Sequence, residues 1–353
     1  MAITRPAGTF DKSYAQDMAI IRTRWQWIML IGGLVLLFCL PAFASSRYLN
    51  VINAICITII AVHGLNILVG YTGQINLGQA AFMAVGAYTS GILTARLGLS
   101  FWIALPCAAL AAGMVGLIFG LPSLRVKGFY LALATLAAQM IMPALILNVR
   151  PDITGGVHTL VIPPPSIFGI KCNSAQSIFY IIVPITLLMT FFAKNITRTG
   201  IGRAFVAVRD NDLAAQLMGI NVFKYKLLAF FICSLYAGVA GSLWAHWARA
   251  IHPDHFTLMH SIWFLGMLIV GGMGSATGVI FGVVFLRTLD EITKVLGTSI
   301  ATVFPALIGN IQGALSVSVY GLVIILFLLF EPRGLAHRWE IFKASYRLRP
   351  FPY

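Results

Sequence analysis

The sequence predicts an all-α fold, a polytopic bundle of about ten transmembrane helices with both ends of the chain in the cytoplasm. Of its 353 residues, 59% are hydrophobic and only 10% are charged, whereas a soluble domain carries about 25% charged residues. Several apolar runs exceed the roughly 18 residues that mark a spanning helix. Lysine and arginine gather in alternate loops between these runs, as membrane topology requires. Much of the surface is therefore expected to face lipid.

Ten apolar runs are the candidate spans. They are residues 27–44, 49–69, 79–95, 101–121, 129–147, 177–193, 227–247, 260–273, 276–296 and 312–330. The stretch 260–330 allows a second assignment, in which 260–287 is one long span and 296–312 supplies the next. Both assignments leave the C-terminus on the same side of the membrane.

The distribution of positive charge sets the direction of the chain. If the N-terminus is cytoplasmic, seventeen lysines and arginines lie in inside segments and five lie in outside segments. The sequence then divides into a cytoplasmic segment at 1–26, a membrane domain at 27–335 and a basic cytoplasmic tail at 336–353. Loop 148–176 is expected outside and the basic loop 194–226 inside.

Charged groups that could drive transport are scarce in the predicted spans. Only Asp290 and Glu291 fall in one, and their spacing to Lys294 and Arg287 lets each pair along one helix face. An ion-pair cluster is favoured over a proton relay. The sequence contains no GxxxxGK[ST] phosphate loop and no HExxH or GxSxG motif. We therefore expect no catalytic residues, and energy for transport would have to come from a partner.

Two other classes of ligand are not expected. The net charge of +14 comes from short loops between apolar runs rather than from basic blocks, which argues against nucleic acid. Four histidines, His246, His252, His255 and His260, cluster with Asp254 near an outside loop, but their spacing matches no zinc pattern. The sequence thus predicts neither a metal site nor a cofactor.

A glycine-rich polar segment, residues 66–79, interrupts two apolar runs. Its glycines permit tight backbone turns, and its amides supply hydrogen-bond donors and acceptors. Irregular backbone at membrane depth persists only where it is buried in protein or lines a wet cavity. One interpretation is a broken helix beside the substrate path, and the other is a short cytoplasmic turn. The candidate path residues are Asn66, Gly70, Gly73, Gln74, Asn76, Gly78 and Gln79.

The inside loop contains a second candidate site. Residues 203–218 can form one amphipathic helix with Leu217 on its apolar face, and Gly219 can end it as a C′ glycine. Such a helix is either a lever for a soluble partner or a passive interfacial helix. The candidate coupling residues are Arg203, Arg209, Asp212, Ala214, Ala215 and Gly219.

Small residues at four-residue spacing predict a close helix contact further along the chain. They are Gly274, Gly278 and Gly282. Gly271, Gly272 and Gly274 itself are also expected to break the chain just before this helix.

Together these segments resemble the LivM-type permease subunits of branched-chain amino acid ABC importers. The similarity lies in residues 66–88, in Thr154-Gly-Gly156, in Leu213 to Gly219 and in Glu331-Pro-Arg-Gly334. The third resembles the EAAxxxG coupling motif of such permeases, although Leu213 takes the place of the glutamate.

The resemblance implies a subunit of the bacterial inner membrane, with 148–176 as a periplasmic loop. It also implies partners: a LivH-type permease, two cytoplasmic ATPase subunits, a periplasmic binding protein and membrane lipid. The expected substrates are branched-chain amino acids or related small organic solutes. The competing hypothesis is a secondary carrier or channel that works alone.

Overall fold

The structure is a computed structural model that describes residues 24–124, 128–156, 158–167, 170–303 and 308–348. The predicted N-terminal segment therefore lies almost entirely outside the described residues, and so does the end of the basic tail. The chain divides into two compact units, Met1–Leu49 and Asn50–Tyr353. In the first unit, α2 (Arg24–Phe43) is an apolar helix with exposed side chains such as Leu36 and Phe43.

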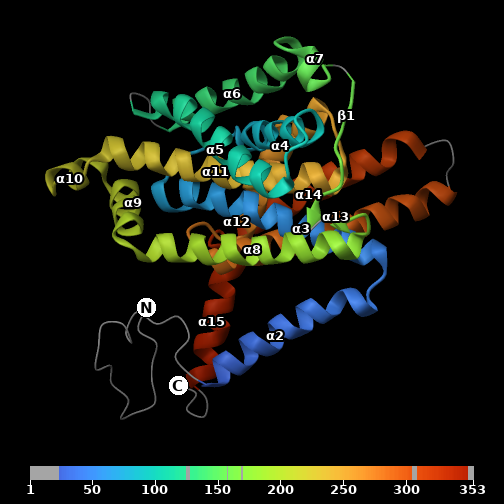
Figure 1. Ribbon diagram of the computed structural model, residues 1–353. Coiled ribbons are helices and arrows are strands. Elements are labelled where there is room, and N and C mark those ends of the chain that lie inside the picture. Colours follow the sequence, from blue (N-terminus) through green and yellow to red (C-terminus); the bar gives the residue numbers. More distant parts are fainter. Residues whose placement is uncertain (1–23, 125–127, 157, 168–169, 304–307, 349–353) are drawn as a thin grey trace. The chain divides into compact units, whose positions relative to one another are not determined.

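The second unit is almost wholly helical (Figure 1). Its helices before the middle of the chain are α3 (Ser46–Leu65), which begins in the first unit, η1 (Asn66–Tyr71), α4 (Gln79–Ala95), α5 (Phe101–Gly120), η2 (Leu121–Leu124), α6 (Phe129–Asn148) and α7 (Pro151–Thr154). The later helices are α8 (Ala175–Arg198), α9 (Gly200–Asp210), α10 (Asp212–Leu217), α11 (Val222–Ala248), η3 (Pro253–Phe256), α12 (Leu258–Gly271), α13 (Ala276–Val303), α14 (Ile308–Phe330) and α15 (Gly334–Leu348).

Strands are confined to short pairs among the described residues. β1 (Leu160–Val161) pairs antiparallel with β4 (Ala250–Ile251), and β2 (Ser166–Ile167) pairs antiparallel with β3 (Ile170–Lys171). The first pair ties the predicted outside loop to the end of α11. The all-α prediction is confirmed, because these two-residue strands only fasten loops.

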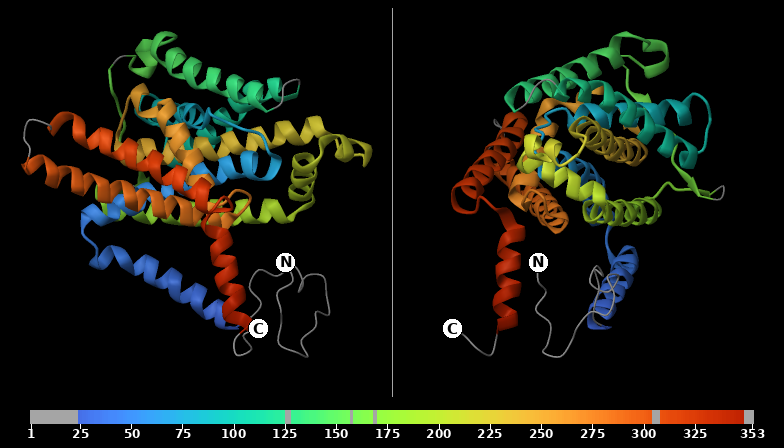
Figure 2. Two further views of the ribbon diagram at one scale, coloured as in Figure 1. Left: turned by 180° about the vertical axis from the view of Figure 1, so that it is seen from behind. Right: turned by 90° about the vertical axis from the view of Figure 1, so that its left-hand side faces the viewer.

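Helix α11 lies in the middle of the second unit and packs against α4 and α5. Figures 1 and 2 show α6 on one side of this core and α8 on the other. Glycines allow the close packing. A Cβ on Gly86 of α4 would fall 2.8 Å from the carbonyl carbon of Gly238, and a Cβ on Gly238 would fall 2.7 Å from the Cβ of Ala112 in α5. Three backbones therefore meet almost without intervening side chains.

Each of the ten predicted spans coincides with a helix. Among the described residues, five helices are long and apolar enough to cross a membrane, and up to seven segments are if each bent pair counts as one span. The number of spans and the side of each terminus stay predictions. The alternative of one long span at 260–287 is not one continuous helix, because the chain bends by 118° between α12 and α13, and whether this bent pair makes one crossing stays a prediction. The span at 296–312 that it required falls partly on 304–307, outside the described residues.

Candidate translocation and coupling site

The glycine-rich segment is a broken helix inside the bundle. Helix α3 passes into the wider π-helical turn η1, the backbone is irregular at 72–78, and α4 then begins at Gln79. Its polar side chains are buried: Asn66, Gln74, Asn76 and Gln79 have at most 5% of their surface exposed. A short surface turn would leave them in water. The structure therefore favours the broken-helix interpretation, while the position of the substrate path stays a prediction.

A network of side chains closes the start of α4. Gln79 donates to the carbonyl of Ala61 at 2.8 Å, and its Oε1 accepts from Asn76 at 3.2 Å and from the thiol of Cys233 at 3.1 Å. The Oδ1 of Asn76 accepts from the backbone N–H of Gly78 at 2.8 Å. Buried amides are costly unless they are satisfied. These contacts therefore hold the break in one conformation and tie it to α11.

Neighbouring helices supply partners for the first N–H groups of α4, which no helix can satisfy internally. Ser261 of α12 accepts from Ala80 N, and Gln139 of α6 accepts from Ala81 N, each at 2.9 Å. Ser261 also donates to Gln139 at 2.9 Å. Sequence reasoning missed both residues. The available signal was a polar Gln139 four positions after Thr135 within an apolar run, and Thr135 indeed accepts from the backbone N–H of Leu77.

The turn between α12 and α13 is a second break in the bundle. One side chain, Asn66, joins it to the broken helix. Asn66 accepts from Gly274 N at 2.8 Å and donates to the carbonyl of Ser275 at 3.3 Å. Gly274 has a φ of +77° and precedes α13. It was predicted both to break the chain and to start a stripe of packing glycines along one helix face; the break is confirmed and the packing role is wrong. The left-handed backbone places Gly274 in the turn between α12 and α13, beside Gly70.

Gly278 and Gly282 do pack helices closely. A Cβ on Gly278 would fall 2.7 Å from the carbonyl oxygen of Gly271, and a Cβ on Gly282 would fall 2.8 Å from the Cα of Gly271. Both contacts are to backbone atoms, which cannot rotate away. These two glycines thus let α12 and α13 approach each other directly after the bend.

The candidate coupling segment lies against the broken helix. Arg209 of α9 donates through Nη1 to the carbonyl oxygen of Gly70 at 3.0 Å, and its Nε donates to Asp210 at 3.0 Å. Gly73, with a φ of +68°, leaves space for this side chain, since a Cβ there would fall 2.9 Å from Cγ of Arg209. A cavity of about 330 Å³ lies between the two segments, bounded by Gly73, Gln74 and Arg209 among others.

The segment forms two helices instead of the single helix expected over 203–218. Asn211 has an extended backbone, and its side chain accepts from Leu213 N and Ala214 N, so it ends α9 and caps α10. Gly219, with a φ of +83°, closes α10 in a Schellman motif, in which Ile220 N donates to the carbonyl of Ala215 at 3.0 Å. The predicted C′ glycine is confirmed.

Short α10 presents apolar side chains outward. Leu213, Leu217 and Met218 are 67%, 89% and 83% exposed, so Leu217 does not share one face with the buried Ala215 as the single helix required. The reason is the break at Asn211, which turns α10 relative to α9 and leaves Ala215 as its buried residue. Asp212 pairs with Lys226 of α11 at 3.4 Å, whereas Arg203 and Ala214 are exposed.

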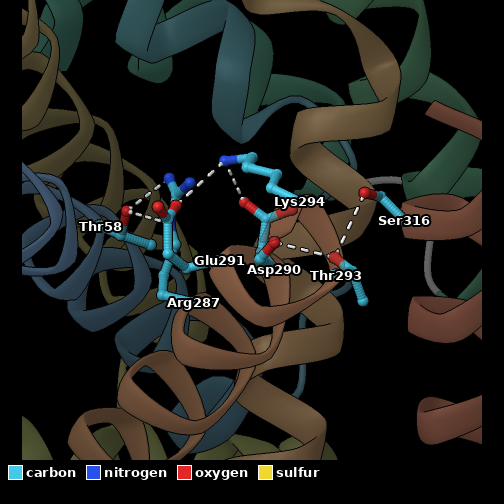
Figure 3. Close-up of polar contacts among 7 residues, drawn as sticks. All are labelled: Thr58, Arg287, Asp290, Glu291, Thr293, Lys294 and Ser316. Atoms are coloured by element: carbon cyan, nitrogen blue, oxygen red, sulfur yellow. Dashed lines mark hydrogen bonds and ion pairs between the residues drawn. The ribbon is translucent and has the colours of Figure 1, made fainter. Parts of the chain in front are cut away.

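The charged cluster of α13 only partly follows the predicted pairing (Figure 3). Lys294 lies 2.8 Å from Asp290 and 3.9 Å from Glu291, which confirms the pair four residues apart. Arg287 does not pair with Glu291 within the described part of the chain. Its Nε and Nη2 instead donate to the hydroxyl of Thr58 on α3, at 3.1 and 2.8 Å.

Two of the four clustered histidines, His252 and His255, have a local structural role. His252 Nδ1 accepts from Asp254 N, and His255 Nδ1 accepts from His252 N, each at 3.3 Å, so the two rings cap the short helix η3. In the stretches that the structure describes, no group of three or more His, Cys, Asp or Glu side chains is arranged to hold a metal ion.

The molecule is thus a bundle of apolar helices whose interior holds a polar chain break, and that break is joined to an exposed helical loop. Such a bundle defines a polytopic membrane protein of the permease class. A family described as branched-chain amino acid transport system / permease component matches residues 47–328. The chain belongs to this family, which confirms both the LivM-type resemblance and a transport subunit rather than an enzyme.

Named relatives support the same assignment. The high-affinity branched-chain amino acid transport system permease protein LivM of Escherichia coli K12 is 33% identical over 293 residues, covering 76% of this chain and 69% of that protein. A probable LivM of Methanocaldococcus jannaschii is 26% identical and covers 77% and 88%. An autoinducer 2 import system permease protein LsrC of E. coli K12 is 25% identical over 283 residues, 76% and 80% of the two chains. No solved structure matches.

Proposed function

We propose that the chain is one permease subunit of an ATP-driven importer, which carries branched-chain amino acids or similar small solutes inward across the inner membrane. The family membership and the LivM relatives support the transported class. A LivH relative that is 27% identical over 253 residues supports a second, similar permease as partner. Two cytoplasmic ATPases and a periplasmic binding protein complete the proposed assembly.

The contact between Arg209 and Gly70 is the observation that carries the mechanism. Its 3.0 Å hydrogen bond joins α9 directly to the main chain of the broken helix. Exposed Leu217 and Met218 on α10 give an ATPase subunit an apolar surface to hold. When the ATPases close, α10 moves with them, and α9 transmits this motion through Arg209 to the backbone at Gly70.

Helix η1, the part of the broken helix that Arg209 contacts, then moves against α4 and the rest of the bundle and opens the path to alternate sides. Chain breaks suit this role because their backbone hydrogen bonds are held by side chains, which can exchange partners more easily than a continuous helix. Asn66 couples this motion to the turn between α12 and α13.

The test is reconstitution of the complete importer in liposomes, with Arg209→Gln as the variant. A hydrogen bond from a charged donor contributes about 1.5–3 kcal/mol, so ATP hydrolysis stimulated by the loaded binding protein should fall about tenfold, while assembly is retained. Arg96→Gln is the control, because Arg96 is bonded to the carbonyl of Asp152 at the opposite end of α4. Unchanged stimulation in a fully assembled Arg209→Gln importer would contradict the proposed coupling.

A further inference from the structure

A second cavity, of about 190 Å³, lies apart from the coupling segment, among α3, α4, α11, η3, α12 and α13. Its apolar walls include Met83, Trp244 and Phe264, and its polar groups are Thr58, Asp254, His255, His260 and Arg287. Its volume is below the roughly 300–1,000 Å³ of sites for drug-sized ligands. The cavity therefore suits a small solute that has one polar end and a compact hydrocarbon part.

Arg287 is the half-buried cation of this cavity. The Thr58 hydroxyl that accepts from it donates in turn to the carbonyl of Ala54 at 2.7 Å, so this hydroxyl is fully engaged. Both nearby carboxylates, Asp290 and Glu291, are bound by Lys294 instead (Figure 3). Within the described residues no carboxylate oxygen forms an ion pair with the guanidinium at 4.0 Å or less, although the charge of Asp290 acts on it from further away.

The chemistry of this arrangement selects an anion with two oxygens. A guanidinium has five N–H donors, and one hydroxyl cannot satisfy them all. A cation removed from water is stabilised by an opposite charge together with hydrogen bonds. The planar fork of arginine matches the two oxygens of a carboxylate. The aromatic and thioether side chains that also line the cavity supply contacts for an aliphatic group.

We propose that this cavity holds the transported solute during passage, with Arg287 binding the carboxylate of the solute and Trp244, Met83 and Phe264 contacting its hydrocarbon part. The inference rests on the proposed function and deepens it, since it assigns the substrate class to carboxylates. Solutes whose carboxylate is replaced by a neutral amide should therefore be rejected by the permease itself, independently of the binding protein.

The first experiment uses the assembled permease and ATPase complex in nanodiscs, without the binding protein. Trp244 and Trp247 both line the cavity, so their fluorescence reports its occupation. We expect leucine to change the fluorescence and leucinamide to need at least tenfold higher concentration for the same change, because a charge-assisted hydrogen bond is lost. Equal responses to both, or a response to sodium chloride alone, would overturn the proposal. No response to leucine would do the same.

The second experiment measures leucine uptake and ATP hydrolysis by the complete importer in liposomes. In Arg287→Gln, the rate of leucine uptake should fall at least tenfold, while ATP hydrolysis without substrate and assembly are kept. Arg287→Lys keeps the charge but not the fork, so its preference for leucine over leucinamide in the fluorescence titration should shrink. Arg96→Gln, which removes a cation far from the cavity, should transport as the unmodified importer does.

The outcomes separate the two proposals. If the unmodified importer shows no ATP-dependent uptake of leucine or related solutes, the proposed function fails. If it transports normally and Arg287→Gln transports within twofold of it, only the carboxylate site fails. Should Arg287→Gln not assemble, Arg287→Lys and the titration of the unmodified complex decide, since both are made on assembled protein.

Discussion

Buried amide side chains replace the missing helical hydrogen bonds where the bundle is broken. Asn66, Asn76 and Gln79 come from the broken segment itself, and Gln139 reaches it from α6. Gln139 also donates to the carbonyl of Phe256 at 2.6 Å. One side chain thus joins α4, α6 and η3, so its removal should affect all three.

Replacement of Gln139 by leucine should destabilise the permease markedly. The change leaves the N–H of Ala81 and the carbonyl of Phe256 without partners in a dry interior, at a cost of about 1–3 kcal/mol for each group. Thermal denaturation of the purified subunit in detergent measures the loss. The control is Asn148→Leu in the same helix, where the side chain is exposed and donates to the carbonyl of Ala144 one turn earlier. Equal melting temperatures for the two variants would contradict the structure.

At the scale of elements, the helices could be predicted from the sequence but their mutual contacts could not. Each of the ten apolar runs became a helix, because burial of apolar side chains in lipid or protein requires internally bonded backbone. The break at Asn211 and the hydrogen bond from Gly274 to Asn66 escaped prediction. Both depend on which neighbouring groups complete the hydrogen bonds, and hydropathy carries no information about neighbours.

The same limit applies to the candidate site. The glycine-rich segment was found because its amides stand out in an apolar context. Gln139, Ser261 and Thr135 could not be connected to it, because they lie 58 or more positions away in sequence. Likewise, spacing along α13 suggested an ion pair for Arg287, whereas the actual partner, Thr58, belongs to another helix.

The packing of α12 against α13 should be weakened by any side chain larger than that of Gly282. In Gly282→Ala, the new methyl meets the backbone of Gly271, and such overpacking costs about 1–3 kcal/mol. Gly321→Ala in α14 is the matched control, since a Cβ there meets no atom within 4 Å. The melting temperature should fall for the first and stay equal or rise for the second. Equal stability of both variants would show that α12 and α13 separate freely.

Helix α10 should bind the ATPase subunit without contributing to the folding stability of the permease. Leu217 and Met218 are exposed, so the double change to serine should leave the melting temperature unaltered and reduce co-purification of the ATPase subunits at least tenfold, because apolar contact area is lost. The control is Leu97→Ser, an exposed leucine after α4. Full retention of the ATPase by the double variant would exclude α10 as the docking element.

At the scale of the whole molecule, the lengths of the helices do not determine the membrane topology. Helix α12 has 14 residues and α13 has 28, and a full span needs about 20. The number of crossings in this region therefore depends on where the lipid boundary lies. The charge distribution still predicts that 194–226 is cytoplasmic and 148–176 periplasmic.

Labelling of single cysteines tests this orientation. In a chain without its native cysteines, Leu217→Cys should react with a membrane-impermeant maleimide only in inside-out vesicles. Val161→Cys, at a residue that is 72% exposed in β1, should react only in spheroplasts. Both reactions follow from the excess of lysine and arginine on the cytoplasmic side. The reverse pattern would invert the assigned direction of transport.

The glycine contacts among α4, α5 and α11 restrict how the permease can change shape. A Cβ on Gly241 would fall 2.8 Å from the backbone nitrogen of Ala87, so α11 has no side-chain layer here on which α4 could slide. Rolling either helix would drive main-chain atoms together. These three helices therefore form one rigid body. The helices that change position during a transport cycle have to be those that surround it.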